Sequence, residues 1–141
     1  MRALLLHGPN LNLLGTRQPE IYGPLTLGEL EDRCRRWGNE IGISLDTFQS
    51  NHEGVLIDRI HAAIGHYDAL IINPGALSHY SYAIHDAITS AALPTIEVHL
   101  SDITARESWR AHSVISAACV ATFVGEGPDG YRHALEALSV L

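Results

Sequence analysis

Short apolar runs alternate along the chain with segments in which apolar residues recur every three or four positions. Each run is about five residues long, the usual length of a strand, and several end at turn-forming residues. Because both faces of a parallel sheet are buried, its strands read as continuous apolar runs. The pattern predicts five strands, over residues 3–7, 43–48, 69–72, 95–98 and 119–124.

Amphipathic helices are predicted between these strands. The first begins at Thr26, because residues 26–29 form a capping box in which the Glu29 side chain bonds the backbone amide of Thr26. It ends before Gly42, a residue suited to the position just after a helix. Ser78 is the expected N-cap of a later helix with its inner face over 84–91. The other helical segments are expected over residues 56–64 and 131–138, with a short helix near 106–109.

Strands that alternate with helices favour a parallel sheet covered by helices on both faces. Right-handed crossovers between five strands predict a doubly wound α/β fold with the flavodoxin-like strand order. The chain shows no linker, repeat or low-complexity segment, so we expect residues 1–141 to form one domain.

Polar residues stand where three of the predicted strands end. Asn10 follows the first strand, Asn73 follows the third, and His99 and Ser101 follow the fourth. Ligands of such sheets bind beyond the carboxyl ends of the strands. We therefore expect these three loops to meet at one crevice.

The composition removes several classes of function. All nine basic residues are Arg and none is Lys, which excludes a Schiff-base lysine and a phosphate-binding lysine of the Walker type. A net charge of −7 disfavours binding to nucleic acid or to an anionic membrane. No apolar run approaches the ~20 residues that span a bilayer, and the start does not resemble a signal peptide. With two widely separated Cys residues, these features lead us to expect reduced thiols and a cytoplasmic location.

Five short motifs, in order and covering nearly the whole chain, resemble those of the type II 3-dehydroquinate dehydratases. They read HGPNLNLLG at 7–15, RQPEIYG at 17–23, QSNHEG at 49–54, INPGALSH at 72–79 and EVHLS at 97–101. The resemblance implies anti elimination of water from 3-dehydroquinate to 3-dehydroshikimate through an enolate, without cofactor, metal or covalent intermediate. It leaves open whether the reaction serves aromatic biosynthesis or quinate breakdown.

Tyr22 is the predicted general base. It lies in a long loop rich in Gly and Pro, five residues after Arg17. A phenol has an ordinary pKa of about 10, and a guanidinium beside it lowers that pKa. Similarity to the family implies that Arg17 activates Tyr22 and stabilises the enolate. We expect residues 15–24 to close over the site as a lid that excludes water.

His99 is the predicted general acid, which protonates the leaving hydroxyl. Glu97 lies two positions earlier, and residues at this spacing share one face of a strand. Glu97 is therefore expected to accept a hydrogen bond from one ring nitrogen and to hold the other toward the substrate.

Other residues are expected to bind the substrate. Asn73 would bond a hydroxyl or a water beside the enolate, and Asn10 would act at the enolate end. The backbone amides of Leu100 and Ser101 suit the substrate carboxylate, since N–H groups ahead of a helix attract anions. The resemblance adds His79 and Arg110 as contacts to substrate hydroxyls. Gly75 and Ala76 complete the predicted shell.

Asp86 is expected to act on a different subunit. It lies seven residues after His79, hence on the same face of the expected helix, and about 10 Å farther along the axis. The resemblance implies that it completes a neighbour's site, with Tyr82 and Thr89 in the same interface. The implied assembly is a homododecamer built as a tetramer of trimers.

Two other classes of function remain open. One is a flavodoxin-like module that binds a small acid or a flavin in the same crevice, and the other is a structural subunit of an oligomer. A metal site is not expected, because neither His61 with His66 nor His79 with His85 has the i,i+4 spacing of a helical zinc pair. The chain departs from the family's usual residues at Asp102, Thr104, Ala111 and Val114.

Overall fold

A parallel sheet of five strands forms the centre of the described chain, which in this computed structural model comprises residues 1–16 and 19–141. The strands are β1 (Arg2–His7), β2 (Ser44–Gln49), β3 (Ala69–Asn73), β4 (Thr95–His99) and β5 (Ala121–Val124). Their order is β2-β1-β3-β4-β5, and every neighbouring pair is parallel. This is the flavodoxin-like order, so the predicted fold class is confirmed.

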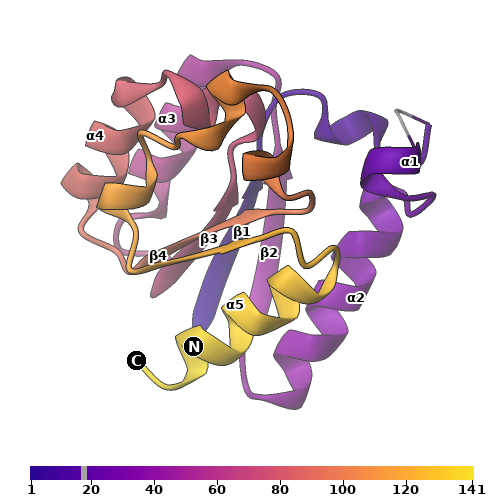
Figure 1. Cartoon of the computed structure of the whole chain (residues 1–141). Helices are drawn as coiled ribbons and strands as arrows, with labels where there is room; N and C mark the ends of the chain where they lie inside the picture. The colour runs from indigo at the N-terminus through magenta and orange to yellow at the C-terminus, as the bar shows by residue number, and fades with distance from the viewer. Residues whose placement is uncertain (17–18) are drawn as a thin grey trace.

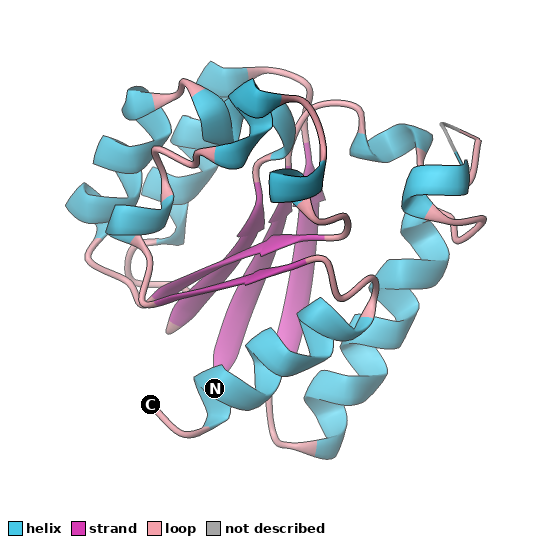
Figure 2. Cartoon of the chain, in the orientation of Figure 1, coloured by secondary structure: helices cyan, strands magenta, loops and turns pink. Residues whose placement is uncertain are grey.

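Helices cover both faces of the sheet (Figures 1 and 2). The helices are α1 (Pro19–Tyr22), α2 (Leu27–Glu40), α3 (Glu53–Ala63), α4 (Tyr82–Ala91) and α5 (Asp129–Ser139). Helices α2 and α5 pack on one face, and α3 and α4 pack on the other.

The alternation of side chains along each strand divides the core into two layers. In β1, Ala3 and Leu5 face α2 and α5, whereas Leu4 and Leu6 face α3 and α4. Both sets are buried, which explains why residues 3–6 of β1 appear in the sequence as an unbroken apolar run.

The helix ends follow the predicted caps with one exception. The Thr26 hydroxyl accepts a hydrogen bond from the Glu29 amide at 3.2 Å, and Gly42 follows the end of α2 with φ +81°. Ser78 is not the N-cap of α4: it lies in a 3₁₀ helix, Gly75–His79, and the Ser81 hydroxyl caps α4 through the Ile84 amide.

The connection after β4 also differs from the prediction. In place of one short helix near 106–109, two 3₁₀ helices form at Ile103–Ala105 and Ser108–Ala111. A third, Ser116–Ala118, lies before β5, and that strand therefore begins only at Ala121.

Both cysteine thiols are free. Cys119 is half-buried, whereas Cys34 is buried in α2.

Within the described residues, no helix is both long enough and apolar enough to cross a membrane.

Two glycines of α2 offer a matched test of the packing. A Cβ on Gly28 would meet open space, whereas a Cβ on Gly38 would lie 2.8 Å from the backbone oxygen of Ile43. We expect Gly28→Ala to raise the free energy of unfolding by about 0.5–1 kcal/mol, the ordinary gain of Ala over Gly in a helix. Gly38→Ala should instead lower it by about 1–3 kcal/mol through overpacking. Urea unfolding of the two variants measures both, and equal effects would contradict the close approach of Gly38 to Ile43.

Candidate active site

A pocket opens at the carboxyl ends of β1, β3 and β4. Its volume is about 490 Å³, counted with the open space at its mouth. It lies where the polar residues after these strands were expected to converge. The predicted residues that line it are Asn10, Asn73, Gly75, Ala76, His79, His99, Leu100, Ser101 and Arg110.

The loops after β1 and β3 form one wall of the pocket by packing backbone against backbone. A Cβ on Gly8 would lie 2.4 Å from the carbonyl oxygen of Pro74, and a Cβ on Gly75 would lie 3.0 Å from that of Pro9. The Gly8 amide also donates to the carbonyl oxygen of Asn73 at 2.8 Å. Only glycine allows this approach, so the two loops are held together as one wall.

Asn10 stands at the end of the first loop with a left-handed backbone, φ 72°, which Asn tolerates better than most residues. Its amide donates to Oδ1 of Asn51 at 2.9 Å, and Nε2 of Gln49 donates to the same oxygen at 3.0 Å. The end of β2 therefore holds Asn10 at the pocket.

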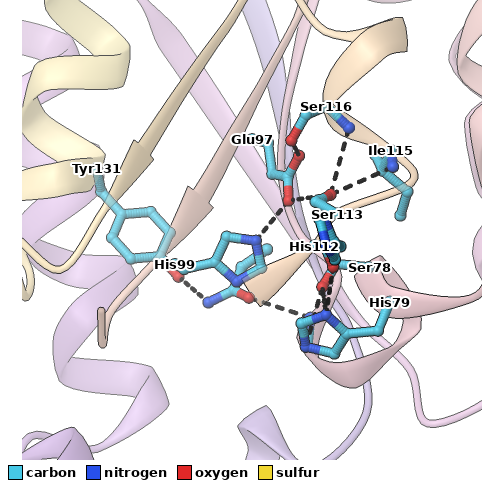
Figure 3. Close-up of polar contacts among 11 residues, drawn as sticks. Ser78, His79, Glu97, His99, His112, Ser113, Ile115, Ser116 and Tyr131 are labelled. Carbon is cyan, nitrogen blue, oxygen red and sulfur yellow. Dashed lines mark hydrogen bonds and ion pairs between the residues drawn. The ribbon is translucent and has the colours of Figure 1, made fainter. Parts of the chain in front are cut away.

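Glu97 and His99 form a buried pair at the end of β4. The His99 ring places Nε2 2.5 Å from Oε2 of Glu97, and the two side chains lie on one face of the strand as predicted (Figure 3). Glu97 is fully buried, whereas His99 lines the pocket. The carboxylate thus holds the ring from behind and leaves its other nitrogen, Nδ1, for a ligand.

Two serines complete the shell of the Glu97 carboxylate. The Ser113 hydroxyl donates to Oε2 and the Ser116 hydroxyl donates to Oε1, each at 2.7 Å. Burial raises the pKa of Glu97, but the hydrogen bond and charge of His99, with the bonds from the two serines, outweigh burial and leave this pKa below its ordinary value. Glu97 is therefore a buried carboxylate that stays ionised.

Asn73 has its carboxamide fixed by two contacts. Its Oδ1 accepts from the Gly75 amide at 3.1 Å, and its Nδ2 donates to the hydroxyl of Tyr131 at 2.8 Å. Tyr131 comes from α5 and lies on the other side of His99 from Ser116 in Figure 3.

His79 and Arg110 both contact the ring of Trp109. The His79 ring meets the indole edge-on at 5.1 Å, and the Arg110 guanidinium lies 4.0 Å from its centre. Nδ1 of His79 donates to the carbonyl oxygen of His112 at 2.6 Å, and Nε of Arg110 pairs with Glu107 at 2.6 Å. These contacts orient both side chains at the rim of the pocket.

Asp102 and Thr104, two of the residues expected to differ from the resembled pattern, contact each other. Oδ1 of Asp102 accepts from both the amide and the hydroxyl of Thr104, at 3.0 and 2.6 Å. Both hydrogen bonds lower the pKa of Asp102, and the bond from the Thr104 hydroxyl has the larger effect. The pair caps the 3₁₀ helix Ile103–Ala105, which follows the pocket residue Ser101.

One predicted residue, Asp86, lies apart from this pocket, and two others lie wholly or partly outside the described residues. Arg17 lies outside the described residues, as does the side chain of Tyr22, whose backbone ends α1. Asp86 is exposed on α4 and is absent from the described pocket lining. The expectation that Asp86 and His79 share one helix is wrong, because His79 ends a 3₁₀ helix and α4 begins at Tyr82.

Several residues of the site escaped the sequence analysis. Arg106 and Ile103 line the pocket, and Ser113, Ser116 and Tyr131 support it from behind. Arg106 lies four residues before the predicted pocket residue Arg110 in the same polar connection, and this spacing could have indicated Arg106 as a second pocket residue. Among the described side chains, no group of three or more His, Cys, Asp or Glu is arranged to hold a metal ion.

The fold and the pocket together define an α/β protein in which a buried carboxylate–imidazole pair opens on a pocket at the carboxyl edge of a flavodoxin-like sheet. Comparison with known proteins places it more closely. The family model described as dehydroquinase class II matches residues 1–139, and the chain belongs to that family.

Relatives and solved structures agree with this placement. A catabolic 3-dehydroquinase 2 of Aspergillus terreus is 53% identical over 133 residues, which cover 94% of this chain and 90% of the relative. A 3-dehydroquinate dehydratase of Bacillus cytotoxicus is 53% identical over 137 residues, covering 97% and 94%. The crystal structure of type II dehydroquinase from Propionibacterium acnes superposes with a TM-score of 0.95 at 42% identity, covering 99% of this chain and 97% of that one.

The serine shell of Glu97 predicts a shift in acid stability. Because the folded-state pKa of Glu97 lies below its ordinary value of 4.5, the carboxylate stabilises the fold above pH 4.5, and this contribution is lost as the pH falls through the folded-state value. Replacing Ser113 and Ser116 together by Ala removes two donors and raises that pKa. The midpoint of acid unfolding, followed by circular dichroism, should therefore move to higher pH.

Ser139→Ala is the matched control for this double variant. Its hydroxyl donates only to the nearby backbone oxygen of Glu136 on the exposed end of α5. The control should leave the acid midpoint unchanged, and an unchanged midpoint in the double variant would show that the serines do not stabilise the ionised carboxylate.

Proposed function

We propose that this protein converts 3-dehydroquinate to 3-dehydroshikimate by anti elimination of water through an enolate. The observation that carries the proposal is the buried Glu97–His99 pair, which opens on a pocket lined by the residues expected to bind the substrate. Membership of the class II dehydroquinase family supports it, as does the similarity to a catabolic 3-dehydroquinase and to a 3-dehydroquinate dehydratase.

Tyr22 and Arg17 begin the reaction. The Tyr22 phenolate removes a proton from the carbon beside the ketone, and the electron pair of the broken C–H bond moves into the carbonyl group to give an enolate. Arg17 favours the phenolate and stabilises the enolate charge. Residues 15–24 close over the pocket and exclude water while the intermediate exists.

His99 completes the elimination. As the enolate collapses to a carbon–carbon double bond, the C–O bond to the leaving hydroxyl breaks, and His99 delivers the proton that turns this group into water. Glu97 accepts from Nε2 and stabilises the protonated ring, so Nδ1 is the nitrogen that acts on the substrate. Base and acid on opposite sides of the substrate ring produce the anti course.

The remaining pocket residues bind the substrate. Asn73 bonds a hydroxyl or a water beside the enolate, and Asn10 acts at the enolate end. His79 and Arg110 bond the hydroxyl groups of the substrate. The backbone amides of Leu100 and Ser101 bind the carboxylate. Gly75 and Ala76 form the adjoining wall, which the close packing of the two loops holds in place.

A second copy of the chain completes the site. Tyr82, Asp86 and Thr89 form an exposed stripe along α4, and Asp86 from this stripe reaches the pocket of a neighbouring subunit. The whole chain, residues 1–141, forms one catalytic domain, and the domains assemble as a dodecamer of four trimers in the cytoplasm. The relatives include both catabolic enzymes and enzymes named only for the dehydration, so the proposal covers either metabolic role.

Tyr22→Phe tests the chemistry directly. Loss of a general base typically costs 10²–10⁴ in rate, so we expect kcat for 3-dehydroquinate to fall by at least about 100-fold with little change in KM. Formation of the conjugated product is followed by its ultraviolet absorbance. Tyr67→Phe, which removes a hydroxyl bonded to Asp46 elsewhere in the fold, is the control and should turn over normally.

Two additions to the same assay test the class of mechanism. Neither a chelator nor borohydride should slow wild-type turnover, since the proposed steps use neither a metal ion nor a Schiff base. A chelator-sensitive rate would overturn the metal-free mechanism. Ligand binding without turnover, unaffected by Tyr22→Phe, would instead favour a binding module.

Hybrid oligomers test the role of Asp86. Tyr22→Phe and Asp86→Ala subunits are each expected to be inactive alone, but on co-expression about one site in four joins an intact Tyr22 to an intact neighbouring Asp86. We therefore expect roughly a quarter of wild-type activity to return. Co-expression of Tyr22→Phe with His99→Gln is the control, because both residues belong to one chain's pocket and no intact site can form. Equal activities in the two mixtures would contradict the shared site.

A further inference from the structure

Tyr131 carries a hydroxyl group into the core directly behind the pocket. Its side chain is fully buried between α5 and the sheet, and it is absent from the described pocket lining. A hydroxyl is costly to bury unless it forms a hydrogen bond, whereas Phe would fill nearly the same volume without that cost. The contact that distinguishes Tyr from Phe here is the 2.8 Å bond to Nδ2 of Asn73.

The directions of the hydrogen bonds around Asn73 follow from its other partner. The Gly75 amide can only donate, so the carboxamide atom 3.1 Å from it is the oxygen. The carboxamide nitrogen therefore faces Tyr131, and the Tyr131 hydroxyl accepts from it. One of the two hydrogens on Nδ2 is thereby used, and the other remains.

We propose, resting on the function given above, that Tyr131 is a positioning residue: its hydroxyl locks the Asn73 carboxamide so that the second Nδ2–H faces the pocket as a hydrogen-bond donor. Asn73 is only 3% exposed, yet it lines the pocket, so the edge of its carboxamide is what a ligand meets. Because the amide oxygen is held by Gly75, the ligand meets a donor and not an acceptor.

The placement of the three residues supports this role. Asn73 ends β3 on the sheet face that α2 and α5 cover, as shown by its i,i+2 neighbour Ile71, which packs in that layer. Tyr131 belongs to the first turn of α5, where the helix reaches the carboxyl edge of the sheet. Burial also raises the pKa of Tyr131 far above its ordinary value, so the hydroxyl stays neutral.

A donor of fixed direction favours the transition state over the bound substrate. It requires no reorientation when an oxygen of the substrate gains negative charge, whereas a freely turning amide must first be ordered. Loss of the Tyr131 hydroxyl should therefore lower kcat more than it raises KM.

A double-mutant cycle tests the coupling. We expect Tyr131→Phe to reduce kcat/KM for 3-dehydroquinate about tenfold, mostly through kcat, which corresponds to about 1.4 kcal/mol of transition-state stabilisation. In an Asn73→Ala background the same change should have less than about a twofold effect, because the group it positions is gone. A purely structural role would lower the melting temperature but give independent, multiplying effects on kcat/KM.

Tyr67→Phe is the matched control for the loss of one hydroxyl. That hydroxyl donates to Asp46 away from the pocket, and its removal should leave kcat and KM unchanged. Wild-type rates in Tyr131→Phe, or multiplying effects in the cycle, would overturn the positioning role while the proposed function stands. A wild-type protein that does not turn over 3-dehydroquinate would overturn the proposed function itself.

Neutron diffraction from wild-type crystals exchanged into D₂O gives a second test, which does not depend on how any variant folds. We expect one Nδ2–D of Asn73 to point at Oη of Tyr131 and the other to point into the pocket. Deuterium on Tyr131 directed at Asn73, or the carboxamide oxygen facing the pocket, would refute the assignment.

Discussion

A carboxylate that is fully buried and yet ionised is the constraint on which the site depends. Such a group is stable only when its oxygens are paired, and Glu97 takes bonds from His99, Ser113 and Ser116. These bonds tie the end of β4 to the 3₁₀ helix Ser116–Ala118, and so fix where the chain turns toward β5 (Figure 3). The imidazole at the pocket is held as part of the same network.

Because side chains alternate along each strand, both faces of the sheet contribute residues to the site. Glu97 pairs in register with Ile72 and lies on the face covered by α3 and α4. Asn73 pairs in register with His7 and lies on the face covered by α2 and α5. At the carboxyl edge of the sheet, groups from both faces come together in one pocket. The imidazole of His99 and the amide of Asn73 are therefore supported by separate parts of the core.

Local patterns predicted what local physics determines. Buried parallel strands appear as apolar runs, and Thr26 caps α2 through a residue three positions away, so strand order and the main helices could be anticipated. The N-cap of α4 was predicted at Ser78, whereas Ser81, three residues later, forms it. The short 3₁₀ helix before α4 has no periodic apolar pattern by which the sequence could distinguish the two serines. Ser113, Ser116 and Tyr131 bond to partners 16, 19 and 58 residues away, for which a single sequence carries no local signal.

The closely packed glycine loops after β1 and β3 form a part of the pocket that tolerates substitution far less than the rest. On their side, Gly8 lies so close to Pro74 that even one added methyl group has no place, which makes this wall a rigid template. Another part of the rim consists of side chains on short 3₁₀ helices, where the half-exposed Trp109 contacts both His79 and Arg110. Efforts to retune ligand selectivity, by directed evolution or inhibitor design, have room to work at that rim, whereas the glycine wall sets a shape that every ligand must match.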